Sequence, residues 1–171
     1  VGSEDFAALG HARHIAARLE NGVVIHNFYV PAGGDIADSD VNQKFCQKMD
    51  YLRDMQAYFQ REVPQKSILV GDLNIAPRED DVWDHKKLLK VVSHTAVEVD
   101  ALAKVQEAGN WVDITRQDVT EGKLYSWWSY RAKNWDDADK GRRLDHIWAT
   151  ADIAATGHSS RIVRDARGWD K

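Results

Sequence analysis

The sequence lacks the features that mark several special classes of protein. Its one cysteine, Cys46, excludes a disulfide within the chain. No run approaches the roughly 20 apolar residues of a membrane span, and no basic region followed by an apolar stretch opens the chain as in a secretory signal. The formal net charge of -4 gives no overall attraction to nucleic acid. We therefore expect a cytoplasmic protein without membrane association, in which any DNA binding rests on a local basic patch.

Apolar residues are present in sufficient number for one core. With 171 residues, 43% of them hydrophobic and seven of them tryptophan, the chain can bury a substantial interior. There is no fixed-period repeat, no low-complexity tract and no linker rich in proline, glycine and serine. We expect residues 1–171 to belong to a single domain.

Two strand-like runs flank Asn21-Gly22 near the start of the sequence. They extend from His14 to Leu19 and from Val23 to Tyr29. Asn-Gly between such runs favours a type I′ turn, in which both central residues have a positive φ. The pattern predicts a β-hairpin.

The middle of the sequence carries two helical patterns. One stripe at steps of three and four predicts a helix over about 42–61 and consists of Phe45, Met49, Leu52, Met55 and Phe59. Pro64 ends this region. A second pattern runs from about Val97 to Ala108, with Gly109 as a plausible stop.

Three further runs are typical of strands. Ser67 to Val70 is short and apolar, as in a strand buried on both faces. Tyr125 to Tyr130 and Leu144 to Thr150 are rich in aromatic and branched residues and lie on either side of a charged loop, 131–143. Strands, hairpins and helices mixed in this order favour an α/β sandwich.

Two polar residues follow the first of these strands, in the stretch SILVGDLNIAP. Side chains alternate across a strand, so we expect Asp72 and Asn74 to share one face, with Gly71 allowing a close approach of the backbone. A carboxylate there can hold a hard cation or take a proton from water, and a carboxamide can donate to a developing oxyanion. The alternative is purely local: Asp72 starts an Asx-turn and Asn74 satisfies a loop backbone.

Four blocks in order carry a resemblance to a known family. They are NFYVPAGG, GDLNIAP, YSWWSYR and RRLDHIWAT. From about His11 onward the chain resembles the exonuclease III family of abasic-site endonucleases, the bacterial branch of the endonuclease/exonuclease/phosphatase superfamily. The resemblance implies an α/β fold of two packed mixed sheets flanked by helices, a four-layer α/β sandwich.

The resemblance also implies a reaction and a set of catalytic residues. In that family the matching tyrosine, Tyr29, reaches the scissile phosphate, and Asp72 orients or deprotonates the attacking water. Asn74 stabilises the transition state, and Asp145 is a second acidic residue needed for catalysis. The implied reaction is metal-assisted phosphodiester hydrolysis, with Asp72 and Asn74 as metal ligands. Mg²⁺ is the favoured cation, with Mn²⁺ as an alternative, because it binds a few carboxylates together with phosphate and water; no Cys/His cluster has zinc spacing.

Asp145 also has a structural interpretation. It shares its predicted strand face with Ile147 and Ala149, where an unpaired buried carboxylate would be costly, so we expect it to have partners. A salt bridge to Arg142 or Arg143 is the alternative to a catalytic role.

DNA contacts are expected near the two late strands. The resemblance places Trp127 at the pocket for the baseless sugar and Arg142 beside it, where some relatives carry an aromatic residue or leucine; a tryptophan shared between two packed layers is the alternative. The loop cations leave a net charge of +2 and are Arg131, Lys133, Lys140, Arg142 and Arg143, opposed by Asp136, Asp137 and Asp139. Arg13 is another candidate phosphate contact. A solvated charged loop is the simpler interpretation.

Parts of the family pattern have no counterpart in this sequence. The family's domain starts with a strand that carries an asparagine and then a glutamate metal ligand, and it finishes with a Ser-Asp-His block. We expect the chain to be the central and later part of the domain, incomplete at both ends and inactive or nearly so alone.

The leading hypothesis is a monomeric, magnesium-dependent DNA repair enzyme that cleaves double-stranded DNA 5′ to abasic sites and removes nucleotides from 3′ ends. Two alternatives stay open. One is a phosphodiesterase of the same superfamily that acts on a phosphate ester other than DNA. The other is a nuclease-like module that binds nucleic acid without cutting it.

Overall fold

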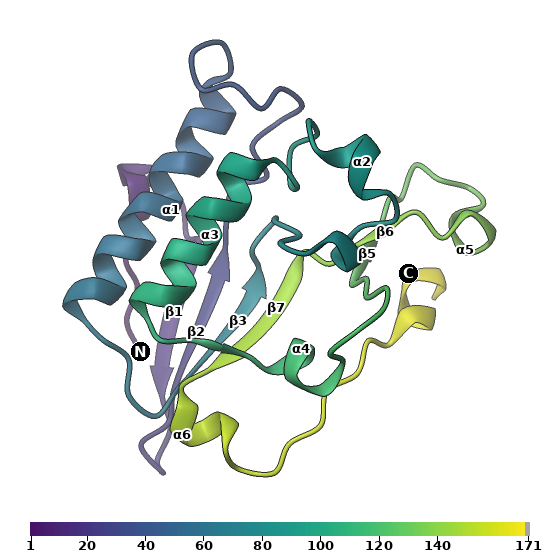
Figure 1. Ribbon diagram of the computed structural model, residues 1–171. Coiled ribbons are helices and arrows are strands. Elements are labelled where there is room, and N and C mark those ends of the chain that lie inside the picture. Colours follow the sequence, from purple (N-terminus) through teal and green to yellow (C-terminus); the bar gives the residue numbers. More distant parts are fainter. Residues whose placement is uncertain (170–171) are drawn as a thin grey trace.

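The computed structural model describes residues 1–169 as strands, helices and connecting loops (Figure 1). The strands are β1 (His14–Arg18), β2 (Val24–Tyr29), β3 (Ser67–Asp72), β4 (Val112–Asp113), β5 (Trp127–Trp128), β6 (Gly141–Arg142) and β7 (Asp145–Ala149). The α-helices are α1 (Gln43–Arg61), α2 (His85–Leu88), α3 (Ala96–Ala108), α4 (Ile114–Asp118), α5 (Trp135–Ala138) and α6 (Ala151–Ala154). The 3-10 helices of this part of the chain are η1 (Phe6–Ala8), η2 (Glu79–Asp81) and η3 (Arg164–Gly168).

The strands within residues 1–169 form two sheets. A five-stranded sheet has the order β1-β2-β3-β7-β4, and β5 pairs with β6 in a smaller one. In the larger sheet β2 and β3 run parallel, and the other neighbours are antiparallel. The predicted α/β class with mixed strands and flanking helices is confirmed.

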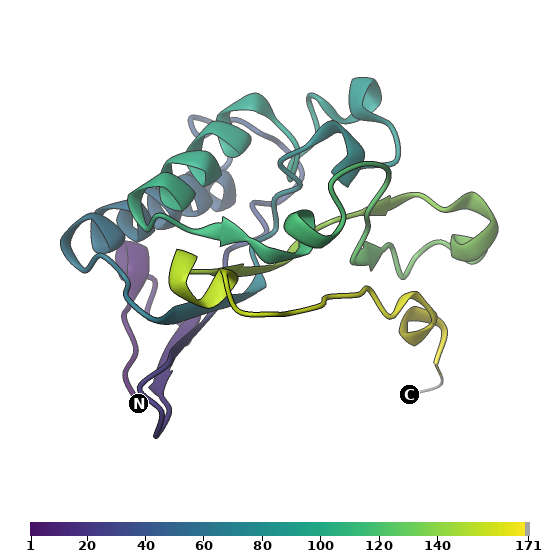
Figure 2. The ribbon, with the colours of Figure 1, turned by 60° about the horizontal axis from the view of Figure 1, so that its bottom comes forward.

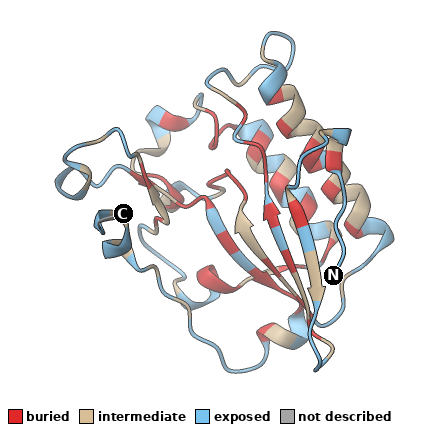
Figure 3. Ribbon diagram, turned by 180° about the vertical axis from the view of Figure 1, so that it is seen from behind, coloured by how far each residue is buried: buried red, intermediate tan, exposed pale blue. Residues whose placement is uncertain are grey.

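Helices α1 and α3 cover one face of the larger sheet (Figures 1 and 2). Inward side chains of the strands pack with the predicted α1 stripe in one core cluster, which includes Phe28, Leu69 and Trp148 from the strands and Leu52 and Phe59 from α1. The opposite face is more open: Asn27, Tyr29, Asp145 and Ile147 are all exposed. Figure 3 shows this alternation of burial along the central strands from behind. Within residues 1–169, no second layer covers these side chains.

The predicted hairpin exists, but its turn is of another type. Gly22 N–H donates to the Leu19 carbonyl and Leu19 N–H donates to the Val23 carbonyl, which leaves a loop of Glu20, Asn21 and Gly22. Gly22 has φ of 83°, whereas Asn21 does not have a positive φ. The prediction of a type I′ turn was therefore wrong: this is a three-residue loop that closes with a left-handed glycine.

The predicted helices are confirmed at both ends. Asn42 caps α1 by accepting from Lys44 N–H, and Gly109 follows the last residue of α3. The strand predicted over 125–130 is much shorter, because only Trp127 and Trp128 pair with β6. Within residues 1–169, no helix has the length and apolar character needed to cross a membrane.

Candidate active site

Three of the predicted catalytic side chains form a row across three neighbouring strands. Tyr29 at the end of β2 is the register partner of Asp72 at the end of β3, and Asp72 is the register partner of Asp145 at the start of β7. Partners directly opposite one another project from the same face of a sheet. Tyr29 is 53% exposed, Asp145 is exposed and Asp72 is half-buried. The structure thus brings a phenol and two carboxylates to one sheet edge, on the open face.

Gly71 lets the two parallel strands meet closely beside this row. Its φ is +134°, and a Cβ at this position would lie 2.0 Å from the Phe28 carbonyl oxygen and 2.8 Å from Asn27 Oδ1. Only glycine fits both that backbone conformation and that space. The glycine therefore helps to place Asp72 next to Tyr29.

Asn74 reaches Asp72 through a turn, which the alternation of side chains along a strand did not predict. β3 ends at Asp72, and Asn74 has a left-handed backbone with φ of 52°, so the alternation rule does not reach it. Its backbone N–H donates to Asp72 Oδ1 at 2.9 Å, and its side-chain Nδ2 donates to the Val30 carbonyl at 2.9 Å. The Asx-turn given above as the alternative is thus present, and it also brings the asparagine to the aspartate.

Burial raises the pKa of Asp72 to about 6. The hydrogen bond from Asn74 N–H opposes this rise, the charge of Asp145 adds to it, and the charge of Lys48 opposes it. A carboxyl with a pKa near neutrality is well matched to accept a proton from water at physiological pH. The electrostatics of the row therefore suit a general base at position 72.

Asp145 differs from its prediction in burial. It is exposed at the start of β7, so the cost of burying a carboxylate does not arise, and the expectation of a buried, paired group was wrong. Arg143 does not pair with it; the Arg143 guanidinium contacts Asp81 and Asp113 instead. Asp145 therefore lies at the β7 end of the row, where its carboxylate is exposed.

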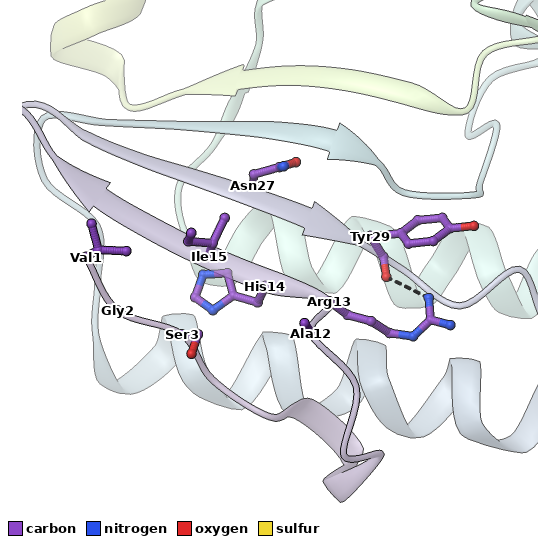
Figure 4. Close-up of a pocket in the computed structure, with 9 residues that line it drawn as sticks. All are labelled: Val1, Gly2, Ser3, Ala12, Arg13, His14, Ile15, Asn27 and Tyr29. Carbon is purple, nitrogen blue, oxygen red and sulfur yellow. Dashed lines mark hydrogen bonds between the residues drawn. The ribbon is translucent and has the colours of Figure 1, made fainter.

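Arg13 lies beside Tyr29, just before β1. Its Nη1 donates to the Tyr29 carbonyl at 3.2 Å, and its guanidinium lies 4.9 Å from the centre of the Tyr29 ring. Both residues line a cavity of about 450 Å³ on the open face, which Figure 4 shows together with Ile15 and Asn27. A cation therefore stands next to the phenol.

Trp127 and Arg142 are register partners in the smaller sheet, with the guanidinium 5.8 Å from the indole ring. Trp127 is partly buried against a cluster that contains Ala76 and Leu144, whereas Trp128 is buried. Arg142 Nη1 donates to the Val92 carbonyl at 3.1 Å and to Ser93 Oγ at 2.8 Å. Much of the Arg142 hydrogen-bonding capacity therefore serves the fold.

The charged loop presents fewer accessible cations than its sequence suggests. Arg143 is fully buried, so it cannot contact a phosphate from the surface. Asp136 and Asp139 pair with Arg164, which lies outside the loop, and therefore offset the loop cations less than the sequence suggests. Arg131 and Lys133 are exposed. The basic patch predicted from five cations is thus reduced, and Arg131 remains its accessible arginine.

Sequence reasoning missed Lys48, which lies behind the site. Its side chain is fully buried, and its ammonium donates to Glu98 Oε1 at 2.5 Å and to the Asn74 carbonyl at 2.8 Å. The signal was its position three residues after Phe45 and four before Leu52, on the apolar stripe of α1. A lysine at such a position needs a partner in the core.

The donor set of the site suits a hard cation. Carboxylate and carboxamide oxygens are the protein ligands that Mg²⁺ uses, and it typically takes one or two carboxylates besides water and phosphate. Asp72 supplies such a carboxylate, Asn74 lies two residues away with its backbone N–H bonded to that carboxylate, and the Asp145 carboxylate is next in the row. Across residues 1–169, no group of three or more His, Cys, Asp or Glu residues is arranged to hold a metal ion. The residues present therefore fit a cation bound in part by water and substrate.

Comparison with known proteins identifies the class to which this fold belongs. The chain is a member of the Endonuclease/Exonuclease/phosphatase family, which it matches over residues 8–168. It is similar to exodeoxyribonuclease III of Haemophilus influenzae, with 26% identity over 157 residues that cover 87% of this chain and 57% of the relative.

Solved structures agree with this assignment. The 3′-5′ exonuclease NExo from Neisseria meningitidis superposes with a TM-score of 0.87 at 27% identity, over 99% of this chain and 64% of that one. A NExo structure described as a 3′ phosphatase bound to a product DNA hairpin gives 0.79 at 28% identity, over 90% and 58% of the chains. An AP endonuclease from Archaeoglobus fulgidus gives 0.76 at 30% identity, over 84% and 54%. The resemblance noted in the four sequence blocks is confirmed, and the chain spans less than two thirds of the length of each of these relatives.

Proposed function

We propose that the protein that contains this chain is a metal-dependent DNA repair phosphodiesterase. It cleaves the backbone 5′ to abasic sites in double-stranded DNA and removes nucleotides from 3′ ends. The observation that supports the proposal is the row of Tyr29, Asp72 and Asp145 on adjacent strands. The Asn74 backbone N–H donates a hydrogen bond to the Asp72 carboxylate. The exonuclease and AP endonuclease relatives support the reaction and the substrate.

The residues of the row have distinct proposed roles. Asp72, with its pKa near 6, accepts a proton from the attacking water or orients it. The Tyr29 phenol, beside Arg13, contacts the scissile phosphate, and Asn74 donates to charge that develops on the phosphate oxygens. Asp145 acts from the far end of the row, where its negative charge adds to the pKa rise that burial causes at Asp72. Water is thus activated on one side of a phosphate held from the other.

A divalent cation is part of the proposal. Asp72 and Asn74 would hold Mg²⁺, or Mn²⁺ in its place, and a bound cation supplies positive charge that offsets the anionic phosphodiester. For the DNA itself we propose contacts from Arg13, Trp127, Arg131 and Arg142. Arg131 is exposed, whereas Arg142 is tethered by hydrogen bonds, so replacement of Arg131 should weaken DNA binding more clearly than replacement of Arg142.

The chain of 171 residues is expected to be inactive or nearly so when produced alone, because it spans only part of each relative. Substantial Mg²⁺-dependent cleavage by this purified chain would contradict that expectation. That the chain forms one domain incomplete at both ends stays a prediction, as do a cytoplasmic location and a monomeric state.

The function is tested with the full-length protein and a duplex that carries one abasic analogue. Cleavage 5′ to the analogue in Mg²⁺, lost in EDTA, supports the proposal, whereas equal cleavage in EDTA eliminates the metal mechanism. Undamaged duplex of the same sequence is the substrate control. Competition between the abasic duplex and a small chromogenic phosphodiester then decides the substrate class. An enzyme for other phosphate esters would hydrolyse the small ester without inhibition by DNA.

A further inference from the structure

A buried ammonium links the two loops that follow the strands of the candidate site. Lys48 Nζ donates to Glu98 Oε1 at 2.5 Å, to the Asn74 carbonyl at 2.8 Å and to the Ala32 carbonyl at 3.4 Å. An ammonium has three N–H donors, so these acceptors satisfy all of them. Ala32 follows β2 and Tyr29, and Asn74 follows β3 and Asp72. One charged group thus fixes both loops relative to each other.

The partner of Lys48 is itself held firmly. Glu98 lies in the first turn of α3 and accepts from Ser93 N–H at 3.0 Å, from Thr95 N–H at 3.2 Å and from Thr95 Oγ at 2.6 Å. Both side chains of the pair are fully buried. The ammonium is therefore anchored to the start of a helix rather than to a mobile side chain.

The surroundings leave little room for the loops to shift. A Cβ at Gly33 would lie 2.9 Å from Lys48 Cδ, so the loop after β2 packs directly on the lysine stem. The two carbonyls after Asn74 are also held by buried side chains: His146 Nε2 lies 2.8 Å from the Ile75 oxygen, and His94 Nδ1 lies 2.6 Å from the Ala76 oxygen. Three consecutive carbonyls of this loop therefore each contact a buried side chain.

Stability alone is a weak reason for such a pair. Taking two charges out of water is costly, and well-packed apolar residues of similar volume often replace a buried ion pair without loss of stability. What an apolar pair cannot supply is three directed hydrogen bonds to an acid and to two loops. The arrangement suits a requirement for geometry at the site.

We propose that Lys48 is a positioning residue for phosphodiester hydrolysis, holding the loops after Tyr29 and Asp72 at their working separation without contacting DNA. This inference rests on the proposed function. Without the ammonium, the left-handed turn at Asn74 relaxes. The Asn74 backbone N–H then moves away from the Asp72 carboxylate, while the surface that contacts DNA is unchanged.

The test uses the full-length protein with Lys48→Met, which keeps most of the stem, and the double variant Lys48→Met/Glu98→Gln, which leaves no buried charge unpaired. The matched controls are Lys104→Met and Lys104→Met/Asp100→Asn, which alter an exposed pair on α3 whose charged atoms are 2.7 Å apart. We expect both Lys48 variants to lose kcat about tenfold or more, with KM for the duplex within about twofold of the parent. The controls should retain both constants.

Amide hydrogen exchange separates positioning from a general loss of stability. If Lys48 positions the loop, exchange of the Asn74 N–H accelerates about tenfold or more, beyond any change at Leu69 in the middle of β3. Equal acceleration at both amides would overturn the proposal, as would a double variant that keeps its kcat and its Asn74 exchange rate. A parent protein that cuts no DNA would refute the proposed function. The exchange measurement would still show whether Lys48 fixes the turn at Asn74.

Discussion

The polar residues of the candidate site and those behind it differ in burial and in charge pairing. The candidate site places Tyr29 and Asp145 in the open, on a sheet face that α1 and α3 do not cover. Behind it, Lys48, Asp81 and Arg143 are fully buried, and each is paired with opposite charge. The buried groups connect elements to one another, whereas the exposed row is left accessible. From this difference we expect the half-buried Asp72 carboxylate to cost the fold some stability at neutral pH, and the buried network to contribute stability.

Asp81 is the centre of the larger buried group. Its carboxylate accepts from Arg143 Nε at 2.9 Å, from Arg143 Nη2 at 3.0 Å and from Arg116 Nε at 3.0 Å. These contacts join η2 to α4 and to the segment that leads into β7 and Asp145. The network therefore reaches the strand that carries one end of the row.

The largest effect should come from breaking this network. Asp81→Ala removes the carboxylate that two buried guanidinium groups share and leaves Arg143 with Asp113 alone, so we expect the free energy of unfolding to fall by about 3–5 kcal/mol. Urea unfolding of the 171-residue chain measures this change. Asp80→Ala, at a neighbouring position that is 47% exposed, is the control and should change stability little. Similar losses in the two variants would remove the distinction between the regions.

The next effect concerns the join between β2 and β3. Gly71→Ala adds a Cβ 2.0 Å from the Phe28 carbonyl at a φ of +134°, so the strands must separate. We expect a loss of about 3 kcal/mol in the free energy of unfolding. Gly157→Ala, where a Cβ meets nothing within 4 Å, should be nearly neutral. A stable Gly71→Ala chain would show that the close approach is not required.

Acid should weaken the buried region. Burial lowers the pKa of His14 to about 4, with the charge of His26 as a further cause, and lowers the pKa of His146 to about 4, with the charge of Arg143 adding to it. The unfolded chain then binds more protons than the fold below the ordinary value of 6.5, so these histidines stabilise the fold above pH 6.5 and lose that contribution as pH falls toward 4.

His14→Phe, which keeps the stacking on Phe28 at 4.4 Å, should lose less stability than the parent between about pH 7.5 and pH 5. His11→Phe, at an exposed position, should follow the parent. The measurement is urea unfolding at both pH values. An unchanged pH dependence in His14→Phe would contradict the role given to burial.

The smallest effect has the opposite sign and belongs to the site. Because the pKa of Asp72 is raised to about 6, its contribution to stability is present in full below the unfolded value of 3.8 and is lost as pH rises through 6. Asp72→Asn should therefore raise the free energy of unfolding at neutral pH by about 1 kcal/mol, a figure discounted for solvent near the half-buried carboxyl.

Thermal unfolding of the 171-residue chain in EDTA checks this sign. The gain in Tm of Asp72→Asn should be present near pH 7.5 and absent near pH 4, where the parent carboxyl is protonated in the fold. A less stable variant at neutral pH would mean that the Asp72 charge supports the fold instead of burdening it.

Local patterns predicted much of the fold. The stripe from Phe45 to Phe59 gave α1, and the apolar run before Gly71 gave β3. The type of the hairpin turn could not be predicted, because the register of β1 and β2 leaves three loop residues where Asn21-Gly22 alone indicates two. The sequence could indicate strands but not how far tertiary contacts extend or shorten them.

The site was predicted in part, for a clear physical reason. The motifs named Tyr29, Asp72 and Asp145, but their row depends on the parallel pairing of β2 with β3 and the antiparallel pairing of β3 with β7, which no local pattern encodes. The exposure of Asp145 depends on which sheet face the helices cover. Lys48 was missed because its partners are 26 and 50 residues away in sequence, and such contacts become visible only in the folded chain.

The most direct test of the central claim is the rate at which full-length Asp72→Asn cleaves the abasic duplex in Mg²⁺ under single-turnover conditions. We predict a fall of about 10²–10⁴-fold relative to the parent, while Asp100→Asn, on the exposed surface of α3, cleaves at the parent rate. Cleavage by a folded Asp72→Asn variant at the parent rate would contradict the assignment of this row of side chains as the catalytic centre.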